Sequence, residues 1–163
     1  MSQEAAKASQ GGSSERRRFY RATIVPETGL RVRVWRMAPG VPLSRTPLRS
    51  QELRVDVRQV CVGGLTVAVG GPACLHGQVR TSDRLRIEVQ YGDQAALLEG
   101  RLRDIPPASN DPRALPQTGV VFQGREVDLP FREARSRLTA IVGFVQREEI
   151  RHRRRMRESA AAA

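Results

Sequence analysis

Apolar residues alternate with polar ones over the first two thirds of the chain, and this pattern constrains the fold more than any other feature. Leu, Ile or Val occupies every second position in each of the clearest stretches. Because successive side chains of a strand point to opposite faces, the alternation predicts strands with one buried face. The candidate strands are 20–25, 30–35, 53–58, 65–69, 84–89, 95–103 and 119–123.

Turn-forming residues separate these candidate strands. Gly, Pro and Asp gather between them, and the longest such stretches are 39–47 and 106–116. Six or seven short strands with this punctuation predict a closed or nearly closed antiparallel barrel, because closure removes exposed strand edges.

The period changes to that of a helix after Pro130. Asp128 is in place to cap a helix there, and Pro130 suits a first helical turn. We predict one amphipathic helix over about 130–156, packed on the barrel by its apolar stripe. The stripe consists of Phe131, Ala134, Leu138, Ile141, Val142 and Val145.

The length of 163 residues suits one domain with tails. Residues 1–14 are small and polar and predict a disordered leader, 15–157 a single domain, and 158–163 a frayed tail. No apolar run approaches the roughly 20 residues that span a bilayer. The N-terminus lacks the basic and then apolar pattern of a signal peptide, so we expect a cytoplasmic protein.

The chain is strongly basic, with 28 Lys and Arg against 17 Asp and Glu, a formal net charge of +11. A positive protein attracts polyanions. Residues 1–21 and 147–158 each carry a net +3, and the remainder supplies +5. The excess is therefore spread out, and by itself it does not identify a partner.

Catalytic and metal-binding classes find little support in the sequence. Two cysteines, Cys61 and Cys74, and two histidines, His76 and His152, are too few to suggest a zinc site. No nucleophile elbow or phosphate-binding Walker loop is present. We expect no enzyme activity, no metal and no cofactor.

Two motifs stand at the borders of predicted strands. Arg16-Arg17-x-x-x-Arg21 lies immediately before the first strand, where either Phe19 or Tyr20 is expected to anchor it to the barrel. The second motif, Gln59-Val60-Cys61-Val62-Gly63-Gly64-Leu65, links two strand patterns. Paired glycines permit close approach of a ligand or of another backbone.

Together these motifs resemble those of the PilZ domain family, bacterial receptors for the second messenger cyclic di-GMP. The family pattern is RRxxxR before the first strand and [D/N]xSxxG entering a later one. Arg16, Arg17 and Arg21 match the first motif. Gly64 matches the final glycine of the second, and Gly63-Gly64-Leu65 resembles the GGL ending common in the family. The resemblance implies a six- to seven-stranded Greek-key split barrel with one C-terminal helix. That helix, with its basic end, looks like those of members associated with flagellar braking.

The resemblance implies that the arm binds cyclic di-GMP, and the chemistry agrees. An arginine can donate two hydrogen bonds to a phosphate or to guanine O6 and N7, or stack on a base. The ligand-binding residues it implies are Arg16, Arg17, Arg21, Gln59, Cys61, Gly63 and Gly64.

The second motif departs from the family pattern at two positions. Gln59 stands where the family has Asp or Asn, and Cys61 stands where it has Ser. A thiol is a weak donor and a weak acceptor. Losing both side-chain hydrogen bonds would weaken binding by roughly tenfold to a few hundredfold.

Three hypotheses for function follow. The first is a non-enzymatic cyclic di-GMP receptor acting on flagellar, pilus or exopolysaccharide machinery. The second is an adaptor that keeps the PilZ-like barrel without binding the ligand, as Gln59 and Cys61 suggest. The third is a small basic barrel that binds nucleic acid, but aromatic residues make up only 4% of the chain, too few for a stacking groove.

Overall fold

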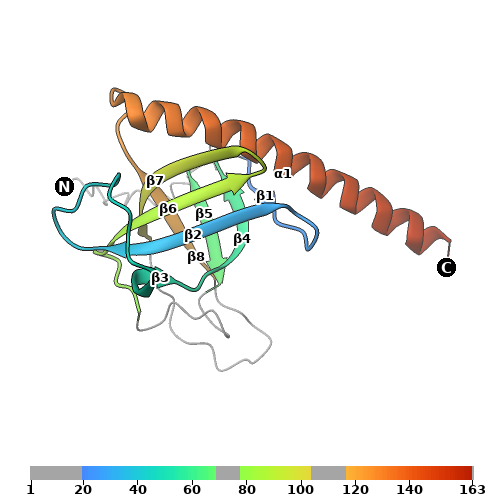
Figure 1. The fold of residues 1–163 in the computed structure, drawn as a ribbon. Helices are drawn as coiled ribbons and strands as arrows, with labels where there is room; N and C mark the ends of the chain where they lie inside the picture. The colour runs from blue at the N-terminus through green and yellow to red at the C-terminus, as the bar shows by residue number, and fades with distance from the viewer. Residues whose placement is uncertain (1–19, 69–77, 104–116, 163) are drawn as a thin grey trace, which may run out of the picture.

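Eight antiparallel strands and one long helix make up the part of the chain that the structure describes. The structure is a computed structural model that describes residues 20–68, 78–103 and 117–162 (Figure 1). A short 3-10 helix, η1 (Arg49–Gln51), precedes β3. The other elements are β1 (Ala22–Thr23), β2 (Leu30–Met37), β3 (Glu52–Leu53), β4 (Asp56–Cys61), β5 (Gly64–Ala68), β6 (Arg84–Tyr91), β7 (Gln94–Leu102), β8 (Gln117–Gln123) and α1 (Leu129–Ala161).

The strands form one curled sheet in the order β1-β4-β5-β8-β7-β6-β2-β3. Strands β6, β7 and β8 are neighbours in sequence and in space, and β5 lies beside β8, which is a Greek-key arrangement. The predicted mainly β architecture with one C-terminal helix is thereby confirmed. The structure has eight strands where the sequence predicted six or seven, because the predicted strand over 53–58 is divided between β3 and β4.

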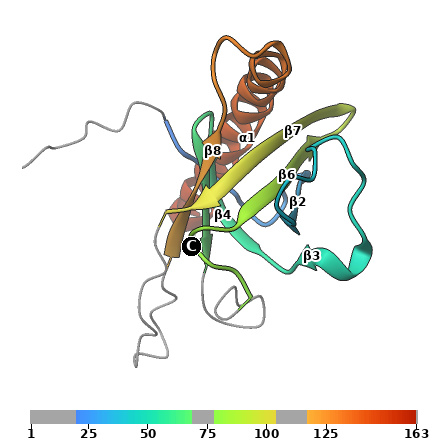
Figure 2. The same ribbon diagram turned by 90° about the vertical axis from the view of Figure 1, so that its left-hand side faces the viewer.

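The core lies inside the curl of the sheet. Alternating residues of the strands fill it, as the period-two pattern predicted, and one side of α1 closes it (Figure 2). Leu138, Ile141 and Val145 of α1 are fully buried with Leu85 and Leu98 of the sheet. Helix α1 contacts β7 and β1 above all, so it bridges strands that lie far apart in the sheet order.

Helix α1 begins where the sequence predicted and continues beyond the predicted end. Asp128 is the N-cap residue, although its side chain makes no capping hydrogen bond, and Pro130 lies in the first turn. The helix runs to Ala161, past the expected end near 156 and into the stretch expected to be a frayed tail. Arginine, methionine, glutamate and alanine all favour a helix, which explains the extension.

Aromatic and polar contacts hold the middle of α1 on the sheet. Tyr91 of β6 stacks on Phe144, with ring centroids 5.3 Å apart, and its hydroxyl donates a hydrogen bond of 2.6 Å to Glu148. This bond raises the pKa of Tyr91, with burial adding to the effect. Beyond Glu149 every residue of the helix is exposed except His152, which is half-buried.

Arginines attach the long segment between β2 and β3 to the sheet. Arg84 and Arg86 of β6 donate hydrogen bonds to the carbonyl oxygens of Val41 and Leu43, each at 3.1 Å. Arg86 also lies over the buried ring of Trp35. These bonds fix the segment that leads into β3.

Among the residues that the structure describes, none of the helices could span a membrane.

Candidate ligand-binding face

The end of the arginine arm lies beside the second motif. Arg16 and Arg17 fall outside the described residues, but Arg21 is described and exposed. Strand β1 pairs with β4 so that Ala22 is opposite Val60 and Thr23 is opposite Gln59. Continuing this register by one residue places Arg21 opposite Cys61. The structure therefore brings one predicted arm residue next to the second motif.

These residues lie on the face of the sheet that points away from the core. Ala22 and Val60 are fully buried in the core, and neighbours along a strand point to opposite sides. Arg21, Gln59 and Cys61 consequently share the other side, which we call the outer face. Helix α1 is on the core side, so this helix does not cover it.

A row of paired residues crosses the outer face from β4 to β7. Cys61 pairs with Gly64, Gly64 with Val121, and Val121 with Arg101. With Arg21 at one end, the row has an arginine on either side of a floor made of small and apolar side chains. Strand neighbours are about 4.8 Å apart, so the two arginines stand on backbones separated by about 19 Å along the sheet.

Gly64 is required by the packing of the sheet itself. A Cβ atom at this position would lie 2.1 Å from the carbonyl oxygen of Val120 on β8. The carbonyl of the neighbouring Gly63 accepts a hydrogen bond of 3.0 Å from the backbone of Phe122. Both predicted glycines thus hold the β4–β5 hairpin close to β8, and any role in ligand binding would be additional.

Two outward-facing arginines, Arg101 of β7 and Arg103 directly after it, were not among the predicted site residues. Ala96, Leu98 and Leu102 are buried, so Arg101 and Arg103 point outward, and both are exposed. The backbone of Arg103 donates a hydrogen bond of 2.8 Å to Gly119, which keeps this end of β7 beside β8. The sequence predicted a strand over 95–103 but did not single out these arginines. Their place beside the second motif depends on sheet order, which the sequence did not reveal.

The base of the arm is attached to α1 through a buried carboxylate. Glu149 is only 2% exposed. Its Oε2 accepts hydrogen bonds of 3.1 Å from the hydroxyl of Tyr20 and from the backbone N–H of Thr23. Its Oε1 accepts a hydrogen bond of 2.5 Å from the guanidinium of Arg153. Burial and then the bond to Glu149 raise the pKa of Tyr20 above its usual value near 10. Tyr20 is therefore an anchor, but its hydrogen-bond partner is on the helix and not on the barrel, where the sequence predicted it.

The fold of this chain is similar to that of a solved structure. The chain is similar to the structure described as the PilZ domain with c-di-GMP of YcgR from Escherichia coli, with a TM-score of 0.52 and 18% sequence identity. The likeness covers 91% of this chain and 99% of that one. The fold is PilZ-like. No protein-family model matches the sequence, and no curated protein is significantly similar to it.

Within this PilZ-like fold, the side chains of the two departing positions are little available to a ligand, although they lie on the outer face. The amide oxygen of Gln59 accepts a hydrogen bond of 3.4 Å from the hydroxyl of Thr66 on β5. Cys61 is a free cysteine and only 9% exposed. In the structure Gln59 is thus engaged across the strands, and Cys61 is a small buried residue.

The basic end of α1 forms a separate cluster on the PilZ-like fold. Arg151, Arg154 and Arg155 are exposed, while Arg153 binds Glu149 and the imidazole of His152 lies 3.2 Å from the carboxylate of Glu27. The described residues contain no group of histidine, cysteine and acidic side chains that could hold a metal ion.

Proposed function

We propose that this protein is a non-enzymatic, cytoplasmic receptor for cyclic di-GMP. The observation that carries the proposal is the position of Arg21, which the β1–β4 register puts opposite Cys61 at the second motif. The likeness to a PilZ domain solved with c-di-GMP supports the same ligand. Two motifs from distant parts of the sequence would then act on one ligand.

The chemistry of the outer face suits a ligand with two phosphates and two guanines. Arg21, with Arg16 and Arg17 of the arm, would bind from the β1 side, and Arg101 would approach from the β7 side. Each guanidinium can donate two hydrogen bonds to a phosphate or to a guanine edge. The floor between them presents little side-chain bulk, so a flat ligand could lie close to the sheet.

The attachment of the arm to α1 offers a route for the signal. Tyr20 precedes Arg21 directly and binds Glu149 of the helix. A ligand that orders the arm would favour one arrangement of the Tyr20–Glu149 contact over another. The ligand would change the position of α1 only to the extent that it binds one of these two arrangements more tightly than the other. The partner protein that binds α1 would belong to motility or biofilm machinery.

The deciding experiment is a calorimetric titration of the protein with cyclic di-GMP. We expect saturable binding by the wild type and loss of binding in Arg17→Ala/Arg21→Ala. Arg132→Ala/Arg137→Ala is the matched control, because both arginines are exposed on α1. A wild type that does not bind, or a double arm variant that binds equally well, would exclude the receptor function.

The second candidate function is an adaptor that does not bind the ligand. The hydrogen bond between Gln59 and Thr66 and the burial of Cys61 favour it, because Gln59 already has a partner and Cys61 is shielded from solvent. On this hypothesis Gln59→Asp/Cys61→Ser creates binding in a protein that otherwise has none. Submicromolar binding by the wild type would eliminate the adaptor.

A further inference from the structure

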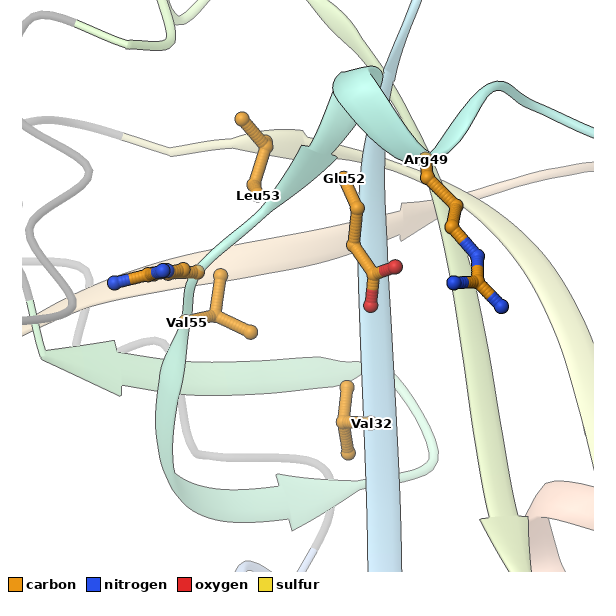
Figure 3. A pocket seen from close by; sticks show the side chains of 6 residues that line it. Val32, Arg49, Glu52, Leu53 and Val55 are labelled. Carbon is orange, nitrogen blue, oxygen red and sulfur yellow. The ribbon is translucent and has the colours of Figure 1, made fainter.

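A hollow of about 460 Å³ lies at the end of the sheet opposite to β1. It is found where β2 faces η1, β3 and the two residues that link β3 to β4 (Figure 3). Val32, Leu53 and Val55 provide apolar surface and are only half-buried. The hollow is lined by Val32, Arg49, Glu52, Leu53, Arg54 and Val55.

One edge of β2 is open beside this hollow. Strand β2 pairs with β6 along its whole length, but it pairs with β3 only at Val34 and Trp35. Over residues 30–33 the side away from β6 has no strand neighbour in the described part of the chain. An open edge of this kind is a template on which an extended peptide can add a strand.

The surroundings of the hollow are basic. Residues 30–55 contain six arginines and a single carboxylate, Glu52, a net charge of +5. Arg33 binds Glu52 through two hydrogen bonds of 3.0 and 2.8 Å, which compensates the only negative charge. Arg49 and Arg54 are left at the rim, and both are exposed. Their charge is complementary to that of an acidic ligand.

Leu48 adds exposed apolar surface next to the rim. It directly precedes η1 and is 67% exposed. An open strand edge, an apolar floor and a basic rim together match a strand in which acidic and aliphatic residues alternate. The aliphatic side chains would enter the hollow, and the acidic ones would face the arginines.

We propose that this groove, formed by the open edge of β2 and the hollow beside it, binds an extended acidic-aliphatic segment of a partner protein. The segment adds to the sheet as a strand antiparallel or parallel to β2. The groove and the outer face are built from different residues, because the lining of the hollow contains neither Arg21 nor a residue of the second motif.

The probe for the test is a synthetic peptide of about eight residues, a common strand length, with alternating Glu and Val. It is titrated into the full-length ¹⁵N-labelled protein and followed by NMR. We expect shifts of the amide signals of 30–33 and 53–55, and slower amide hydrogen exchange along β2. A peptide of alternating Lys and Val has the same β propensity pattern and opposite charge, and we expect it not to bind.

Charge-reversed variants separate the groove from general attraction to a basic protein. Arg49→Glu/Arg54→Glu should weaken binding of the Glu-Val peptide about tenfold. Arg132→Glu/Arg137→Glu makes the same change of net charge on the exposed surface of α1 and should leave the affinity unchanged. The proposal is overturned if the Glu-Val peptide does not bind, if its shifts map elsewhere, or if both double variants weaken it equally.

Discussion

The hydroxyl of Tyr20 donates a hydrogen bond to the carboxylate of Glu149, across 129 positions of the sequence. Tyr20 is the last residue before Arg21, and Glu149 is the last buried residue of α1. The backbone of Thr23 binds the same carboxylate oxygen. The position of the arm beside β4 and that of the helix on the sheet are consequently coupled through one buried acidic group.

Replacing this carboxylate should destabilise the protein more than removing the tyrosine hydroxyl. Glu149→Ala leaves the partly buried amide of Thr23 and the guanidinium of Arg153 without their acceptor, and we expect a loss of about 2 kcal/mol. Glu149→Gln keeps an acceptor for Thr23 and should cost less. The free energy of unfolding is measured by urea denaturation.

The matching change at the other partner is Tyr20→Phe, which keeps the ring and removes one hydrogen bond at a half-exposed position. We expect a loss of about 0.5–1 kcal/mol. If Glu149→Ala were as stable as the wild type, the coupling of arm and helix through this group would be refuted.

The sheet should not tolerate a side chain at Gly64. In Gly64→Ala the methyl group would meet the carbonyl oxygen of Val120 at 2.1 Å, so β5 and β8 must separate. We expect a loss of about 1–3 kcal/mol, as for other overpacked sites. The control is Gly119→Ala on β8, where the nearest atom is the Cβ of Arg103 at 3.9 Å. Equal stability of the two variants in thermal unfolding would contradict the close approach at Gly64.

The sequence was informative wherever a regular period marked one buried face. The inward residues of β6 are buried as predicted, and so is the apolar stripe of α1 except for Phe131, which is half-buried. Burial of one face is what a regular period encodes. The division of the predicted strand 53–58 into β3 and β4 could not be predicted, because two residues are too few to show a period. The end of α1 was placed too early because arginines carry no apolar stripe, although they favour a helix.

Predicting the site needed information that a local pattern does not contain. The arm motif and the second motif could be found in the sequence. The β1–β4 pairing, continued by one residue, then places Arg21 opposite Cys61. Arg101 resembles any other outward arginine until β7 is known to lie next to β8. The salt bridge that compensates Glu52 was equally invisible, because Arg33 reaches it across the β2–β3 pairing.

Acid should destabilise the protein in part through Glu99. The hydrogen bonds from Arg84, at 3.0 and 2.8 Å, lower the pKa of the Glu99 carboxyl below its usual 4.5. A carboxylate with a lowered pKa in the folded state stabilises the protein above the unfolded value, near 4.5. This contribution is lost as the pH falls through the folded pKa.

The measurement is the free energy of unfolding at pH 7 and below pH 4.5. Glu99→Gln should lower the free energy of unfolding by about 1 kcal/mol at pH 7, because the side chains of Glu99 and Arg84 are only about a quarter exposed. The free energy of unfolding of this variant should also decrease less between pH 7 and acid pH than that of the wild type. Glu133→Gln, at an exposed position of α1, serves as control and should keep the wild-type pH dependence. A Glu99→Gln variant with the full acid dependence would show that this pair does not contribute.

Arg101 should contribute to ligand binding although no motif includes it. It stands at the end of the row Cys61–Gly64–Val121 and faces the same side as Arg21. Loss of one charge-assisted hydrogen-bonding group corresponds to about 1.5–3 kcal/mol, so Arg101→Ala should weaken cyclic di-GMP binding by at least about tenfold. Arg137→Ala, which removes the same charge from α1, should bind like the wild type. In calorimetry, unchanged affinity of Arg101→Ala beside a strong effect of Arg21→Ala would restrict the site to the β1 side of the outer face.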